Sequence, residues 1–328
     1  MKNRLFFTGT LVSILVLSFS GFAWAAYPDR PITLIVNYAA GGSADVGARA
    51  LAEVAEKILG QPIAVLNKVG ASGSLGTGAV AAAKPDGYTI GMTSWSPLVL
   101  GPHMFDVPYN PLKDFDQILC YAKVMYGPCV RADSPFKTLK DLVQYAKANP
   151  GKIKYSAAGL AVPNHFGMAL LAKAEGGIKW ELVVFKGNIE AVAACLGGHV
   201  DIVSQNPADV VPYIQSGKLR LLASLCDTRW KWVPDVPTVR ELGYKFDVGS
   251  YYALGAPKGV PKPIMDKLTS SFKKAAEEPR FREVMEEKLY VPVYYRSGEE
   301  YQKIVEMDYK EMGDLIMELG LDKSQQKK

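Results

Sequence analysis

The residues best placed to do chemistry form the stretch from Leu34 to Asp45, where an apolar run passes through two glycines into a helical pattern. The run from Ile32 to Tyr38 predicts a buried strand of a parallel sheet. Gly41 and Gly42 allow a sharp turn and the close approach of a ligand. A helix that begins at Ser43, the expected N-cap, would present free N–H groups and its positive dipole end. The stretch predicts an anion site, although many α/β proteins have the same arrangement for packing alone.

Other strand ends carry residues of the same kind. A glycine-rich loop at 70–76 opens a helix of small residues, and the strand from Tyr88 to Thr93 runs into a serine-containing segment at 93–96. Ligands bind at the carboxyl ends of strands in doubly wound sheets, so these loops and the first one are expected near a ligand. The segment 153–165 repeats the opening pattern, with His165 at the start of its helix. This histidine either belongs to the site or faces solvent.

Patterns typical of catalysis and nucleotide binding are incomplete. The segment 76–81 matches a dinucleotide motif but lies within a helical stretch, and no Walker A lysine follows a glycine loop. The segment 70–74 lacks the last glycine of G-x-S-x-G, and the histidines are not spaced as metal ligands. The sequence shows no convincing set of acid, base and nucleophile. We therefore predict a protein that is not an enzyme and that needs no metal or cofactor.

Alternating strands and helices predict two α/β units with mixed sheets flanked by helices. The helices that resume after residue 260 need a sheet to cover, and the first unit lacks enough cover of its own. We therefore expect residues 26–124 plus 250–328 to form lobe 1 and residues 125–249 to form lobe 2. Two lobes joined by two crossings enclose a cleft and can close by hinge motion. Capping residues predict helix starts at Thr138 and Thr238, the second helix ending at Leu242.

Residues 1–25 have the features of a secretory signal peptide. Lys2 and Arg4 precede an apolar stretch that ends at Ala23-Trp24-Ala25, which predicts cleavage after Ala25. An uncleaved membrane anchor is the alternative, but the apolar core is short for a bilayer. The formal net charge of +5 is too mild to indicate nucleic acid. We expect an exported, soluble protein that does not bind nucleic acid.

The four cysteines leave the redox state open. In an oxidising compartment, local pairing would join Cys120 to Cys129 and Cys195 to Cys226. Four buried free thiols are the alternative.

A set of short motifs runs in order along nearly the whole chain after residue 26: Tyr27-Pro28-Asp29-Arg30-Pro31-Ile32, Tyr38-Ala39-Ala40-Gly41-Gly42-Ser43-Ala44-Asp45, Lys84-Pro85-Asp86-Gly87-Tyr88-Thr89, Pro108-Tyr109-Asn110-Pro111, Lys113-Asp114-Phe115, Phe185-Lys186-Gly187, Gly197-Gly198-His199-Val200-Asp201, Gly217-Lys218-Leu219-Arg220 and Pro234-Asp235-Val236-Pro237-Thr238. Together these motifs resemble the periplasmic solute receptors of tripartite tricarboxylate transporters, also called Bug receptors. The resemblance implies an α/β, two-lobed periplasmic-binding-protein (Venus flytrap) fold without catalysis. It also implies a periplasmic location and delivery of the ligand to membrane permease subunits, and we expect a monomer.

The resemblance further implies that a ligand carboxylate is held between two strand-to-helix loops by backbone N–H groups, small hydroxyls and waters. Those loops match Tyr38 to Asp45 and Ser156 to His165. The expected ligand-binding residues are Tyr38, Ala40, Gly41, Gly42, Ser43, Asp45, Thr93, Ser94, Trp95, Ala158, Gly159, Asn164, His165, Lys186, Gly187, Gln205 and Tyr251.

Departures from the family pattern bear on the ligand. Gln205 stands where members often have an acidic residue, which would pair with the ammonium group of an amino acid. Trp95 stands where the family residue is usually small. Trp95, Tyr251 and Tyr252 either line an aromatic pocket wall or belong to the hinge or core. These residues favour a mono- or dicarboxylate with an apolar or aromatic body over an amino acid or citrate.

The first hypothesis is therefore a periplasmic carboxylate receptor that serves a permease. The alternatives are an exported α/β enzyme that acts on a small acid through His165, Asp45 or Lys186, and a ligand-presenting partner of a membrane sensor.

Overall fold

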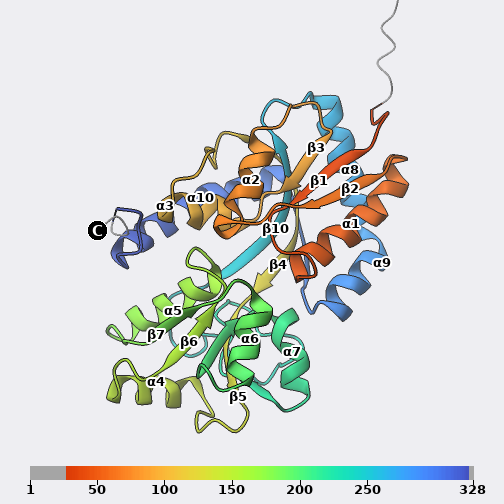
Figure 1. Cartoon of the computed structure of the whole chain (residues 1–328). Helices are drawn as coiled ribbons and strands as arrows, with labels where there is room; N and C mark the ends of the chain where they lie inside the picture. The colour runs from red at the N-terminus through yellow and green to blue at the C-terminus, as the bar shows by residue number, and fades with distance from the viewer. Residues whose placement is uncertain (1–26, 325–328) are drawn as a thin grey trace, which may run out of the picture.

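The structure is a computed structural model that describes residues 27–324, arranged as two lobes, each built on its own sheet (Figure 1). The predicted signal peptide, residues 1–25, lies outside the described residues. Within residues 27–324, no helix is both long enough and apolar enough to span a bilayer.

Lobe 1 contains a mixed sheet with the strand order β11-β4-β10-β3-β1-β2 among the described residues. Its strands are β1 (Ile32–Val36), β2 (Ile63–Asn67), β3 (Thr89–Met92), β4 (Phe115–Met125), β10 (Gly249–Pro257) and β11 (Val293–Ser297). β1 runs parallel to β2 and β3, and Leu34 is in register with Val65 and Ile90. β10 runs antiparallel to β3 and β4. The late strand β10 therefore lies at the centre of the sheet that the N-terminal strands begin.

Helices cover this sheet because their apolar residues recur at helical spacing. The helical segments of lobe 1 are α1 (Ser43–Leu59), η1 (Ala71–Gly73), α2 (Ser74–Ala81), η2 (Ser96–Leu100), α3 (Gly101–Met104), α8 (Lys262–Glu277), α9 (Pro279–Arg282), η3 (Glu283–Lys288) and α10 (Gly298–Glu318). α8 packs against α1 and β4 through a buried face that includes Leu268, Phe272 and Ala275 (Figure 1). The helices after residue 260 thus pack on the sheet that contains β4.

Lobe 2 contains a second mixed sheet with the strand order β7-β6-β8-β5-β9 in the described part of the chain. Its elements are β5 (Gly127–Arg131), α4 (Leu139–Ala148), β6 (Lys154–Ala157), α5 (Pro163–Ala174), β7 (Glu181–Val184), α6 (Asn188–Leu196), β8 (Ile202–Gln205), α7 (Pro207–Gln215) and β9 (Leu219–Leu221). The predicted start of α4 is confirmed: Thr138 accepts a hydrogen bond from Asp141 N–H, and the Asp141 carboxylate accepts one from Thr138 N–H.

Two chain segments cross between the lobes side by side. The first passes through Tyr126, between β4 and β5, and the second returns through residues 226–248 into β10. Leu225 N–H donates to Tyr126 O, and Val248 N–H donates to Leu225 O, both at 2.8 Å. These hydrogen bonds join the crossings into one narrow connection between the sheets.

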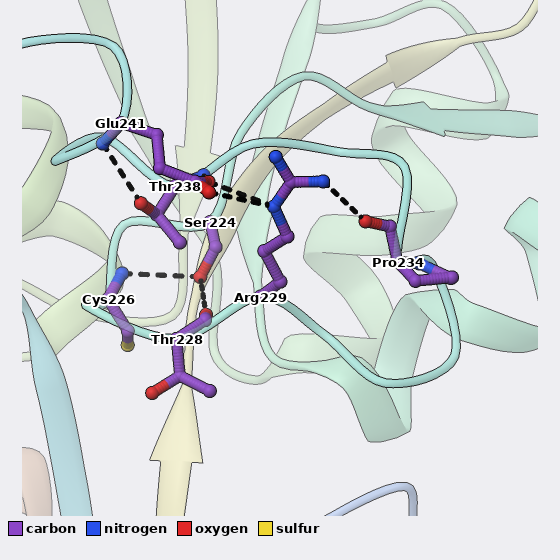
Figure 2. A network of polar contacts seen from close by, with 7 residues as sticks. All are labelled: Ser224, Cys226, Thr228, Arg229, Pro234, Thr238 and Glu241. Carbon is purple, nitrogen blue, oxygen red and sulfur yellow. Dashed lines mark hydrogen bonds and ion pairs between the residues drawn. The ribbon is translucent and has the colours of Figure 1, made fainter.

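Residues 224–241, which include most of the return crossing, are irregular and are held by polar contacts (Figure 2). Ser224 Oγ donates to Thr228 O at 2.8 Å, and Arg229 donates to both carboxylate oxygens of Glu241. Thr238 and Glu241 make the reciprocal hydrogen bonds of a helix cap. The predicted helix from Thr238 to Leu242 is nevertheless wrong, because the chain makes only a turn and Thr238 is in a bridge with Ser224.

Other local predictions also need correction. Gly42, not Ser43, is the N-cap of α1, because Ser43 already has helical geometry and its Oγ lies 3.0 Å from Tyr252 Oη. Of the two alternatives for the cysteines, the structure has the second: within residues 27–324 all four are buried free thiols. Cys120 lies on β4 of lobe 1 and Cys129 on β5 of lobe 2. Burial raises the pKa of the Cys120 thiol to about 12.

Candidate functional site

A cavity of about 620 Å³ lies where loops of the two lobes face each other. Lobe 1 contributes residues 37–44, 69–73 and Ser96, and lobe 2 contributes 158–159, 162–164, 186–190, Asn206 and Asp209. Tyr126 and Tyr252, on or beside the crossing segments, complete the wall. This volume is in the range of small-molecule sites.

Helix N-termini converge on this cavity. The N-cap residues of α1, α5, α6 and α7 are Gly42, Val162, Gly187 and Asn206, and all four line the cavity. Among the described residues, none of these N-caps accepts a hydrogen bond from its own helix through a side chain. The first N–H groups of a helix have no acceptor within the helix. α5 and α7 begin with Pro163 and Pro207, which have no N–H group, so the free donors come mainly from the first turns of α1 and α6. The wall combines these donors with four positive helix dipole ends, which favours an anion.

The loop before α1 is held from behind by Asp45. Its Oδ2 accepts a hydrogen bond from Gly41 N–H at 2.9 Å, and Arg49 Nε donates to both carboxylate oxygens at 3.0 Å. Asn67 Nδ2 joins Asp45 Oδ1 at 2.8 Å and Tyr38 O at 3.0 Å. Gly41 adopts φ +81°, a conformation that suits glycine. Asp45 is thus a positioning residue, and it does not line the cavity.

The ionisation of Asp45 fits this role. Burial alone would raise its pKa, but hydrogen bonds from Arg49, Gly41 N–H and Asn67 lower the pKa below its ordinary value. Asp45 is therefore charged at neutral pH and keeps its contacts to the loop.

A tyrosine hydroxyl supports the same helix start. Tyr252 comes from β10, lines the cavity, and shares a hydrogen bond with Ser43 at 3.0 Å. Burial raises the Tyr252 pKa well above its ordinary value, so the phenol remains neutral. Burial likewise raises the pKa of Tyr38 to about 12, against the opposing effect of Ser96 and Ser94.

The two lobes come close at the cavity. A Cβ placed on Gly159 would lie 3.3 Å from Ser72 Oγ of the opposite lobe, and Gly159 has φ +143°. Ser72 lies in the loop at 70–73, one of the strand ends that the sequence predicts near the site. A larger residue at position 159 would strain the backbone and push against Ser72.

The lobe 2 wall contains a clamped carboxylate. Asp209 Oδ2 accepts hydrogen bonds from Asn206 Nδ2 at 2.6 Å and Asn188 Nδ2 at 2.8 Å. Burial raises the pKa of Asp209 to about 6, although both amides oppose the shift.

Ten of the residues expected in the site line this cavity: Tyr38, Ala40, Gly41, Gly42, Ser43, Ala158, Gly159, Asn164, Lys186 and Gly187. They lie in loops between a strand and a helix, except Ser43 and Asn164, which lie in the first turn of the helix that follows. Their side chains are mostly small, which leaves the backbone accessible to a ligand.

Six other expected residues lie outside the cavity lining, in addition to Asp45. His165 is buried with its Nδ1 at 2.7 Å from Tyr155 Oη, and burial lowers its pKa to about 4. Gln205 is fully buried and its Oε1 accepts from Asn206 N–H. Both side chains pack in the core of lobe 2 behind the loops.

The remaining expected residues face the core of lobe 1. Thr93 Oγ1 donates to Gln117 Oε1 at 2.6 Å, and Ser94 is fully buried. Trp95 is 3% exposed and its Nε1 donates to Asp308 of α10 at 2.6 Å. Tyr251 packs against the rings of Tyr294 and Tyr301. Trp95 and Tyr251 therefore take the core positions that the sequence left as their alternative, and Tyr252 lines the cavity.

Sequence reasoning missed the lining residues Val69, Tyr126, Asn188, Ile189, Glu190, Asn206 and Asp209. Asn206 and Asp209 follow the buried strand β8 in an Asn-Pro-x-Asp segment. That polar strand end is the same signal that marks the other loops.

Comparison with known proteins gives a consistent result. Residues 47–321 match the model of the tripartite tricarboxylate transporter family receptor. The "UPF0065 protein in gbd 5′ region" of Cupriavidus necator is 40% identical over 299 residues, which cover 91% of this chain and 90% of that protein.

Solved structures agree in fold. The periplasmic binding protein BugD is 34% identical and superposes with a TM-score of 0.81 over 90% of this chain and 99% of BugD. MatC of Rhodopseudomonas palustris, solved with bound malate, is 28% identical with a TM-score of 0.80 over 88% of this chain and all of MatC. From the family match and these relatives, the chain belongs to the family of tripartite tricarboxylate transporter receptors, the periplasmic solute-binding proteins of TctC/Bug type.

Proposed function

We propose that this receptor binds a small mono- or dicarboxylate in the cavity between its lobes and delivers it to the permease subunits of a tripartite tricarboxylate transporter. The observation that carries the proposal is the convergence of the N-termini of α1, α5, α6 and α7, without side-chain caps among the described residues, on one cavity. Free N–H donors at several dipole ends stabilise a negative charge without a counter-ion from a side chain.

We place the ligand carboxylate at the start of α1. Gly42, Ser43 and Ala44 line the cavity there, and Ser43 is 7% exposed, so few waters compete for its N–H group. Hydrogen bonds to an ionised acceptor contribute about 1.5–3 kcal/mol each. The loop residues Tyr38, Ala40 and Gly41 and the lobe 2 residues Ala158, Gly159, Asn164, Lys186 and Gly187 complete the proposed site.

The aliphatic part of the ligand is expected to contact Val69, Val162 and Ile189. Val69 and Ile189 come from opposite lobes and are 55% and 75% exposed. A hinge motion about the segments at residues 126 and 226–249 would bury both side chains against the ligand. We infer lobe boundaries at these two crossings, near the expected 124/125 and 249/250. The malate bound to the relative MatC supports a small carboxylate.

The remaining properties follow from the family and the sequence. We infer that residues 1–25 direct export and are removed, and that the mature receptor is a periplasmic monomer that is not an enzyme. The positions of His165, Asp45 and Lys186, the residues that an enzyme would need for catalysis, do not support the enzyme alternative. His165 is hydrogen-bonded to Tyr155 and Asp45 is paired with Arg49, whereas Lys186 lines the cavity.

A thermal-shift screen of the chain from residue 26 tests the proposal. The protein is unfolded and refolded to remove any bound acid, then heated with aliphatic di- and tricarboxylates, amino acids and aromatic acids. A ligand at about 100 times its Kd stabilises the fold by roughly 2.7 kcal/mol. We expect a shift with at least one small carboxylate. The absence of a shift, together with no acid released from the unfolded protein in mass spectrometry, would contradict the proposal.

A further inference from the structure

The carboxylate of Asp209 is held in one orientation by two amides. Asn188 Nδ2 and Asn206 Nδ2 both donate to its Oδ2, at 2.8 and 2.6 Å. A 180° flip of the Asn206 amide would lose two hydrogen bonds, because Nδ2 donates to Gln205 Oε1 at 3.4 Å as well as to Asp209. The clamp therefore fixes which carboxylate oxygen remains for other partners.

Within residues 27–324, no group donates a hydrogen bond to the other oxygen, Oδ1. A ligand in the cavity could therefore donate to it. Asp209 lines the cavity and is partly accessible. Lys186, which also lines the cavity, is exposed, and Glu190 accepts a hydrogen bond from Lys186 N–H. Asp209 thus presents an acceptor that the protein itself leaves unused.

Asp209 also shares its surroundings with the proposed anion site. It interacts electrostatically with Tyr252, whose hydroxyl contacts Ser43 at the start of α1. The charge of Asp209 also contributes to the raised pKa of Tyr126, at the first crossing. The cavity therefore has N–H donors at the start of α1 and an acceptor at Asp209.

We propose that Asp209 selects carboxylates that also carry a hydrogen-bond donor, a hydroxyl or an ammonium group, over plain carboxylates of the same length. This inference rests on the proposed function, because the carboxylate at α1 is what brings the donor to Asp209. An ionised Asp209 accepts from either donor and repels a second carboxylate. Gln205 is buried behind the wall, so its lack of charge does not exclude an amino acid.

The test compares acids that differ in one substituent. Binding of succinate, L-malate and L-aspartate, and of glutarate, L-2-hydroxyglutarate and L-glutamate, is measured by titration calorimetry at pH 8 with refolded protein. We expect a donor-bearing acid of at least one length to bind about tenfold or more tightly than the plain diacid, since a hydrogen bond to a charged group is worth this much. The order of the hydroxy and amino acids identifies the donor.

The variant Asp209→Asn keeps an oxygen for Asn188 and Asn206 but replaces the free acceptor with an N–H donor. We expect it to abolish or reverse the preference, with tighter binding of the plain diacid. The matched control is Asp235→Asn, which removes an equal charge from an exposed position of lobe 2 outside the cavity. This control is expected to retain the parent preference.

Equal binding of plain and donor-bearing acids would overturn the inference and leave the proposed function intact. The inference would also be overturned if Asp209→Asn kept the preference for donor-bearing acids. It would likewise be overturned if a carboxylate without a hydrogen-bond donor bound while none of these six acids did. Failure of every carboxylate in the wider screen would instead overturn the proposed function, and this inference with it.

Discussion

The largely buried carboxylate of Asp209 should make the ligand-free receptor less stable as pH rises. Its pKa is raised from 3.8 to about 6, first by burial. A raised folded-state pKa means that the folded protein holds the proton more tightly than the unfolded chain. The stabilising effect is therefore complete below about pH 4 and is lost as the pH rises through about 6.

The size of the effect follows from the same values. One pKa unit corresponds to about 1.36 kcal/mol, so ionised Asp209 lowers the free energy of unfolding by about 3 kcal/mol. Asp209→Asn removes the charge and preserves an acceptor for Asn188 and Asn206. We predict that Asp209→Asn matches the parent protein at pH 4 and exceeds it by about 3 kcal/mol at pH 8.

Urea unfolding of refolded protein at pH 4, 5, 6, 7 and 8, followed by circular dichroism, measures this difference. Asp235→Asn serves as the control, because Asp235 is exposed and distant from the cavity lining. A variant that gains nothing between pH 4 and pH 8, or that is less stable than the parent at pH 8, would refute the reasoning about Asp209.

Further predictions concern the loop, the core and the lobe 2 helix. Arg49→Met removes the cation that pairs with Asp45 and should destabilise the protein at pH 7. The Asp45 pKa lies below its ordinary value, so the pair stabilises the fold only while Asp45 is ionised. Urea unfolding should therefore show a smaller loss of stability as the pH falls and Asp45 protonates. Leu34→Ala opens a space in a fully buried strand and should cost about 2–5 kcal/mol in the same assay. Thr138→Ala removes the capping box of α4 and should cost about 1 kcal/mol, whereas no change would show that the cap contributes nothing.

The course of the strands and most helices could be predicted from the sequence because apolar periodicity and turn residues act locally. The buried run of β1 and the cap at Thr138 are examples. The strand β11 was missed because half-buried residues in 293–297 give no clear alternation. The helix predicted at Thr238 failed because Thr238 pairs with Ser224, a contact distant in sequence that no local pattern reveals.

The site could be predicted where backbone geometry defines it and not where side chains do. Glycine turns marked the loops at Gly41 and Gly159. The directions of Trp95, His165 and Gln205 depend on partners from other elements, such as Asp308 on α10 for Trp95. Their burial could therefore not be inferred from position in a strand-to-helix loop.

In the proposed site, a ligand carboxylate binds the free N–H groups at the start of α1. Proline at the first position of a helix keeps helical geometry and lacks only the N–H group. Gly42, with φ −75° and ψ 165°, has a conformation that suits the residue before a proline. Ser43→Pro thus removes one donor, and Ser43→Ala removes the hydroxyl contact to Tyr252 while it keeps that donor.

Titration calorimetry of these two variants, with the acid that gives the largest thermal shift, measures how much this N–H group contributes to binding. Loss of one hydrogen bond to an ionised carboxylate should weaken binding to Ser43→Pro by roughly 10- to 150-fold relative to Ser43→Ala. Equal affinity of the two variants, with both folded, would contradict carboxylate binding at the start of α1.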